Sequence, residues 1–186
     1  MTTWRDIPPL SNAQRTMVQD GLLIEYAPGY VAPADLAATP ALRGALLAPL
    51  LPAPFTALTF SAVWIYTGWW PRDRLPGVYA AHPIKARHPA SCRRVIHPEF
   101  VTTIGGVRLT TPARTAADLL LLESHDVALE GVLTMLGGYV RVEEIAEQLR
   151  HEGGRRNLPW ARKMIPQLAE YVEWRTRELI VAACRR

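Results

Sequence analysis

Four residues of metal-ligand type lie close together in the middle of the chain: His82, His88, Cys92 and His97. Zinc sites use these side chains, but their ligands recur at short, fixed spacings. The successive spacings here are six, four and five residues, which match no zinc module. The surrounding sequence predicts strands and proline-rich turns. We therefore expect neither a metal site nor a cofactor.

A catalytic centre is not predicted either. Ser61 lacks the glycine-flanked sequence that holds a nucleophilic serine on a sharp strand-to-helix turn. The sequence contains no glycine-rich phosphate loop, and Cys92 and Cys184 are too far apart to suggest a disulfide framework. Two separate cysteines are typical of reduced thiols in the cytosol. We expect a protein without enzymatic activity.

Three polar residues near the N-terminus could read double-stranded DNA. Asn12 and Gln14 carry amides that can bond adenine, and Arg15 can bond guanine or a phosphate. The alternative interpretation is a solvated helix face, because Asp20 and Glu25 would repel the phosphate backbone. The residue types support both interpretations.

Arginine dominates the positive charge of the chain. Of the 21 basic residues, 19 are arginine, and the formal net charge is +4. The charge is uneven, with −1 over residues 1–50 and +5 over residues 51–110. Within the second stretch we assign a DNA-binding role to Arg72, Arg87, Arg94 and Arg108. The alternative is that these arginines are scattered over solvated faces.

The elements that would position these residues begin with a helix over residues 11–20, capped by Ser11. A hairpin is predicted over residues 22–32, with its turn at Pro28 and Gly29. A short helix followed by a hairpin is the closing half of a winged helix. Only ten residues precede Ser11, so the opening half is expected to be missing, and residues 1–35 are predicted to form a partial winged-helix-like unit.

The predicted fold class is α+β, and residues 36–186 are predicted to form a second domain. Residues 59–67 favour a strand by propensity, although Gly68 would also end a helix. Strands are expected over 78–81, 94–96, 101–103 and 107–109, which together predict a mixed sheet. Helices are expected over 41–51, 113–122, 127–136, 142–151, 158–168 and 172–183.

The composition is that of a globular protein, with 49% hydrophobic residues. The N-terminal sequence has no signal-peptide core, and the apolar stretches are short or broken by proline. We expect a soluble, cytoplasmic protein with no membrane partner.

Three stretches, in this order, resemble the AbiEi-type antitoxin regulators of actinobacteria. Gly21-Leu22-Leu23 with Gly29-Tyr30-Val31 is similar to the wing of that family, and Ser61–Gly68 is similar to one of its helices. The most specific stretch is GVRLTTPARTAADL at residues 106–119, which resembles the family's strand-to-helix block. The resemblance covers roughly residues 15 to 180.

The resemblance implies a non-enzymatic transcriptional regulator that binds operator DNA and neutralises a nucleotidyltransferase-type toxin. It also implies a structural role for five residues of the family motif: Ser61, Thr111, Arg114, Thr115 and Asp118. Arg114 and Asp118 are four residues apart on one predicted helix, so they can pair. With Thr111 they could hold the backbone of the preceding strands.

The sequence departs from this family at both ends. Family members usually begin with a full winged helix, and longer relatives continue past a segment like residues 172–179 into a nuclease-like domain. Glu173 matches the glutamate that opens that domain, but the sequence ends at Arg186, so we expect no nuclease activity. Two alternatives stay open: a protein-interaction module that has lost DNA binding, and a truncated, inactive relative of a nuclease-like protein.

Overall fold

A computed structural model describes residues 9–71, 78–82 and 91–184. Its α+β fold confirms the predicted class. The chain divides into two compact units, Met1–Thr111 and Pro112–Arg186. The domain boundary expected after residue 35 lies inside the first unit, because the first hairpin leads directly into a 3-10 turn, Ala34–Ala37, that contacts the next helix.

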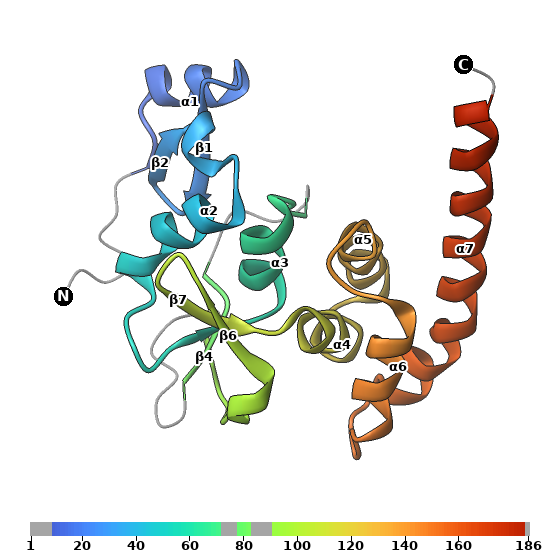
Figure 1. Ribbon diagram of the computed structural model, residues 1–186. Helices are drawn as coiled ribbons and strands as arrows, with labels where there is room; N and C mark the ends of the chain where they lie inside the picture. The colour runs from blue at the N-terminus through green and yellow to red at the C-terminus, as the bar shows by residue number, and fades with distance from the viewer. Residues whose placement is uncertain (1–8, 72–77, 83–90, 185–186) are drawn as a thin grey trace. The chain divides into compact units, whose positions relative to one another are not determined.

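The first unit opens with the predicted helix and hairpin, α1 (Asn12–Gln19), β1 (Leu23–Ala27) and β2 (Tyr30–Pro33), drawn in blue in Figure 1. The side chain of Ser11 accepts a hydrogen bond from the Gln14 backbone, and the Gln14 side chain accepts one from the Ser11 backbone. This capping box satisfies two amides at the start of α1. Strands β1 and β2 pair antiparallel around a turn in which Gly29 has a φ of +74°.

The central sheet of the first unit has the strand order β5-β4-β3-β7-β6. Its strands are β3 (Thr56–Ala57), β4 (Ala80–His82), β5 (Ser91–Arg93), β6 (Val101–Ile104) and β7 (Val107–Thr110). The pairs β3–β7 and β4–β5 are parallel and the others are antiparallel, so the predicted mixed sheet is confirmed.

The prediction of a strand over residues 94–96 is wrong. Strand β5 lies directly before that segment, and its last residue, Arg93, is in register with His82 of β4. The Arg94 amide donates to the His82 carbonyl, and Val95 is 74% exposed. Strand β3 was not predicted, since two residues give no periodicity to detect.

Residues 59–67, which β-propensity favoured as a strand, form helix α3 (Thr59–Thr67). Its first eight residues are all buried, so the segment shows no amphipathic period that would reveal a helix. Gly68 ends it with a φ of +79°. The buried Arg43, on α2 (Pro40–Leu47), donates to the carbonyls of Ile65 and Tyr66 in the last turn. Tertiary contacts therefore override local propensity here.

Tyr66, at the end of α3, buries its hydroxyl and donates a hydrogen bond of 2.8 Å to the Thr110 carbonyl of β7. Burial raises the pKa of this phenol above its ordinary value of 10.0. The folded state therefore keeps the proton at a pH where the unfolded chain releases it. The stabilisation from this group is complete below pH 10.0 and is lost as the pH rises above that value.

The Tyr66→Phe variant is expected to unfold with a weaker dependence on alkaline pH than the wild type. The wild type should lose up to about 1.4 kcal/mol per pH unit from this residue alone between pH 10 and pH 11. Urea unfolding at a series of pH values, compared between the two proteins, gives the difference in slope. Equal slopes would show that Tyr66 ionises as freely in the folded protein as in the unfolded chain.

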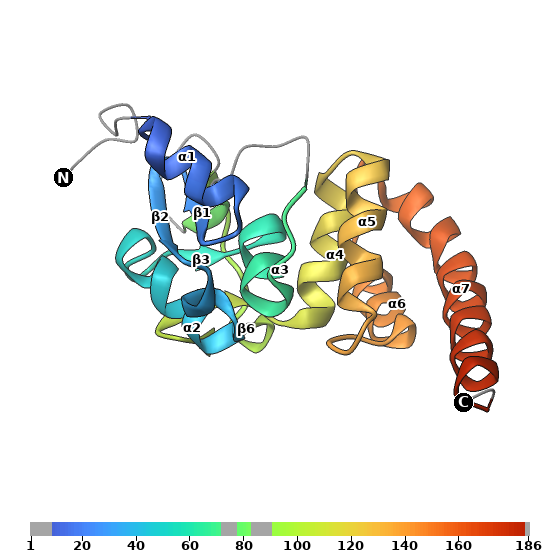
Figure 2. The same cartoon turned by 90° about the horizontal axis from the view of Figure 1, so that it is seen from above.

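The second unit is helical, as predicted, with α4 (Pro112–Leu122), α5 (His125–Met135), α6 (Val142–Arg150) and α7 (Leu158–Cys184) (Figure 2). Its buried residues include Leu119, Leu120, Met135, Ile145 and Leu149. The two helices expected at the C-terminal end are one helix, α7, which continues through Pro166. No glycine follows Gly154 in the sequence to end it. Within the described residues no helix combines the length and the apolar character needed to cross a membrane.

Candidate nucleic-acid interface

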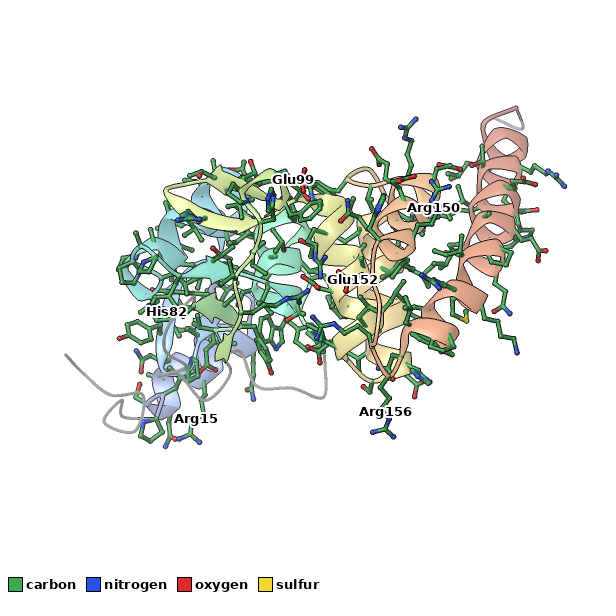
Figure 3. All side chains as sticks on the ribbon, turned by 90° about the horizontal axis from the view of Figure 1, so that it is seen from below. Arg15, His82, Glu99, Arg150, Glu152 and Arg156 are labelled. Carbon is green, nitrogen blue, oxygen red and sulfur yellow. The ribbon has the colours of Figure 1, made fainter. Side chains whose placement is uncertain are left out.

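Helix α1 carries the three residues that are predicted to read DNA, Asn12, Gln14 and Arg15. None of its residues is buried, although the helix contacts β1. Asn12 and Arg15 are exposed, and Figure 3 shows Arg15 pointing into solvent. The Arg15 Nε donates to the Leu10 carbonyl at 3.0 Å, which holds the side chain beside the start of the helix. Helix α1 is thus capped at its start, exposes polar side chains and contacts strand β1 of the hairpin.

The structure gives Gln14 a capping role that would compete with the predicted base recognition. Its Oε1 accepts hydrogen bonds from the backbone nitrogen of Ser11 at 2.9 Å and from the Ser11 hydroxyl at 3.0 Å. A bidentate bond to adenine uses the same amide oxygen. Gln14 cannot cap the helix and read adenine in this way at once, so Asn12 and Arg15 are better placed to read bases.

Glu25, whose negative charge would repel the DNA backbone, is half-buried on β1. Its Oε1 accepts a hydrogen bond of 2.9 Å from the Gly29 amide in the hairpin turn. The carboxylate is therefore directed toward the hairpin turn. Asp20, at the C-terminal end of α1, is exposed, so its charge stays at the far end of the helix from Asn12.

The arginines of the central sheet are only partly described. Arg72 and Arg87 lie outside the described residues. Arg108 is exposed on β7 between the buried Val107 and Leu109, so it projects from the opposite face of the strand. Arg94 follows β5, three strand positions from β7 in the sheet, which corresponds to about 14 Å. Arg94 and Arg108 therefore do not form a tight cluster, but two positive charges at this separation can contact separate phosphates.

The metal-type residues have ordinary packing roles where the structure describes them. His82 packs edge-on against Phe55, with ring centroids 4.7 Å apart, and His97 lies 3.1 Å from the exposed Glu99. His88 and the side chain of Cys92 lie outside the described residues. Among those described, no three histidines, cysteines or acidic residues are close enough together to hold a metal ion.

The residues of the predicted structural motif are divided between the two units, with Ser61 and Thr111 in the first and Arg114, Thr115 and Asp118 in the second. Ser61 is fully buried on α3 and its Oγ accepts a hydrogen bond of 2.8 Å from the Tyr79 amide, just before β4. The Thr111 amide donates to the Phe100 carbonyl at 2.9 Å, which continues the pairing of β6 and β7. Thr115 is fully buried on α4.

The predicted pair of Arg114 and Asp118 is confirmed. One terminal nitrogen of Arg114 lies 2.5 Å from the Asp118 carboxylate, and the other lies 2.5 Å from the carboxylate of Glu152. Burial alone would lower the pKa of Arg114, but the hydrogen bonds and charges of Asp118 and Glu152 raise it above its ordinary value. The guanidinium stays charged and joins α4 to the segment after α6, which is a structural role.

Glu152 was missed in the sequence, and no local signal could have found it. It lies 38 residues from Arg114, in the connection between α6 and α7. The same connection is held by Arg162, which donates to the Leu149 carbonyl at 2.9 Å, and by Asn157, which donates to the Leu121 carbonyl at 3.3 Å. These long-range bonds fix the helices around the Arg114 ion pairs.

Comparisons of the chain with protein-family models, with curated proteins and with solved structures found no match.

Proposed function

We propose that this protein is a DNA-binding transcriptional regulator of the AbiEi antitoxin type, and that α1 enters the major groove of its operator. The observation that carries the proposal is the exposed, capped α1 resting on the β1–β2 hairpin. An α-helix fits the major groove, where amides and guanidinium groups read base edges. The resemblance at residues 106–119 adds a nucleotidyltransferase-type toxin as the protein partner.

The net charge differs between residues 1–50 and residues 51–110, so we infer that these two parts contact DNA in different ways. Residues 1–50 carry a net charge of −1, so α1 cannot supply much attraction for phosphates. Residues 51–110 carry +5, and there Arg108 is exposed on β7. We assign base recognition to α1 and phosphate contact to the arginines of the sheet region. The affinity for DNA should therefore fall as the salt concentration rises. The slope of log affinity against log salt concentration should correspond to a few phosphate contacts.

Replacing Arg15 with alanine is expected to weaken operator binding. Loss of a bidentate contact to guanine costs about 1–3 kcal/mol, and loss of a phosphate contact lowers the salt slope by about one. Fluorescence anisotropy at several salt concentrations measures both effects. A matched control is Arg156→Ala, which removes an exposed arginine from the second unit. If both variants bind operator DNA like the wild type, Arg15 has no part in recognition.

A further inference from the structure

Arg43, on α2, joins two segments of the first unit that are far apart in the sequence. Helices α2 and α3 lie side by side there (Figures 1 and 2). The Arg43 Nε and one terminal nitrogen donate to the carbonyls of Ile65 and Tyr66 in the last turn of α3, at 2.9 and 2.7 Å. The other terminal nitrogen donates to the Ala37 carbonyl at 2.7 Å. Arg43 is only 5% exposed, so its planar guanidinium fixes the end of the 3-10 turn to the end of α3 with little competition from water.

The 3-10 turn, Ala34–Ala37, connects the hairpin to the rest of the first unit. It contacts both strands of the hairpin as well as α2. The Ala34 amide donates to the Leu22 carbonyl, just before β1, at 3.0 Å. A second attachment is the ring of Tyr26 on β1, which stacks on Trp64 of α3 with centroids 6.2 Å apart. Because α1 contacts β1, the position of α1 relative to α3 depends on this turn and this stack.

Helix α3 is also bonded to the strand that carries Arg108. The Tyr66 hydroxyl donates to the Thr110 carbonyl of β7 at 2.8 Å, two residues after Arg108. The first eight residues of α3 are all buried, so the helix cannot shift without disturbing close packing around it. Through Arg43 and Tyr66, α3 therefore sets the position of α1 relative to Arg108.

We propose that Arg43 is a positioning residue for DNA recognition, which holds α1 where it reads base edges while Arg108 contacts a phosphate. This inference rests on the proposed function. The duplex fixes the distance between phosphates and base edges, and phosphate contacts set the register of a protein on it. A displaced α1 leaves the phosphate contacts in place but loses its alignment with the bases. Arg43 itself is buried, so it acts on sequence discrimination and contributes no phosphate contact.

The Arg43→Lys variant of the full chain tests this role, because it keeps the charge and removes the planar fork that bonds both segments. The measured quantity is the ratio of the affinities for the DNA upstream of its own coding sequence and for a scrambled duplex. This ratio should fall at least about ten-fold, the size of one lost bidentate base contact. The affinity for the scrambled duplex and the salt slope should stay at their wild-type values.

Arg114→Lys is the matched control. Arg114 is also buried and also bonds groups that are far apart in the sequence, but it lies on α4 in the second unit. Its variant should keep the wild-type ratio, and circular dichroism should show both variants to be folded at the temperature of the titration. A second test variant, Tyr26→Leu, removes the stack on Trp64 and leaves Arg43 in place. It should lower the same ratio without changing the salt slope.

Hydrogen exchange without DNA tests the attachment itself. In Arg43→Lys the amides of residues 34–38 should exchange faster than in the wild type, while those of β7 should keep their wild-type rates. Unchanged exchange at residues 34–38 would overturn the positioning role.

The binding results separate this inference from the proposed function. A wild type that does not distinguish the two duplexes would overturn the proposed function and the inference with it. A wild type that does distinguish them, beside an Arg43→Lys variant with an unchanged ratio, would overturn the positioning role alone. An equal fall in Arg43→Lys and Arg114→Lys would also overturn it, because lost stability would then be the cause.

Discussion

Replacing Arg114 with methionine is expected to lower the free energy of unfolding by about 3–5 kcal/mol. Arg114 is the cation between Asp118, which is fully buried, and Glu152, whose side chain is 14% exposed. Methionine fills a similar volume but leaves two carboxylates without their cation. Removing one partner of a buried ion pair is costly because the remaining charge has already lost its water.

Chemical denaturation with helical ellipticity as the signal measures this loss, and Arg177→Met is the matched control. Arg177 also pairs with a glutamate on α7, but both side chains are largely exposed, so its replacement should change stability by less than about 1 kcal/mol. Adding Asp118→Asn and Glu152→Gln to Arg114→Met should recover part of the loss by removing the stranded charges. A loss no greater than that of the control would contradict the role of Arg114 as the buried link between the helices.

The Gly105→Ala variant is expected to be destabilised by more than about 3 kcal/mol, from backbone strain and overpacking together. Gly105 lies in the β6–β7 turn with a φ of +57°, where an alanine is strained. A Cβ there would also overlap the Ala41 carbonyl of α2, and backbone atoms cannot move aside as a side chain can. Gly44 on α2 is equally confined, since a Cβ would overlap the Ile104 carbonyl.

The matched control for this variant is Gly21→Ala. Gly21 has a φ of +73°, but a Cβ there would meet nothing within 4 Å. It therefore carries the conformational cost of about 1–2 kcal/mol without the overlap. Thermal unfolding of the two variants separates the two contributions. Equal losses would show that α2 and the β6–β7 turn can move apart at little cost.

The parts of the fold that could be predicted from the sequence rest on local chemistry. Ser11 caps α1, the pair Gly105-Gly106 forms the turn between β6 and β7, and Pro112 is the first residue of α4. Each depends on residues that are neighbours in the sequence. The pairing of Arg114 with Asp118 also follows from spacing within one helix.

The parts that could not be predicted depend on residues far apart in the chain. Helix α3 is stabilised by its burial on all sides and by Arg43, which lies 22 residues before the Ile65 carbonyl to which it donates. Glu152 joins the Arg114 site from beyond α6. In the candidate interface, the amide of Gln14 could be assigned from its position either to capping or to base reading. The structure places it in the cap.

The most direct test of the proposed function is a fluorescence-anisotropy titration of the wild-type protein against two duplexes. One is the DNA upstream of its own coding sequence and the other has the same composition in scrambled order, each at two salt concentrations. We predict tighter binding to the upstream DNA at both salts, because base contacts from α1 persist when phosphate attraction is screened. Equal, weak binding to both duplexes that vanishes at the higher salt would contradict the proposal and leave only non-specific attraction by the arginines.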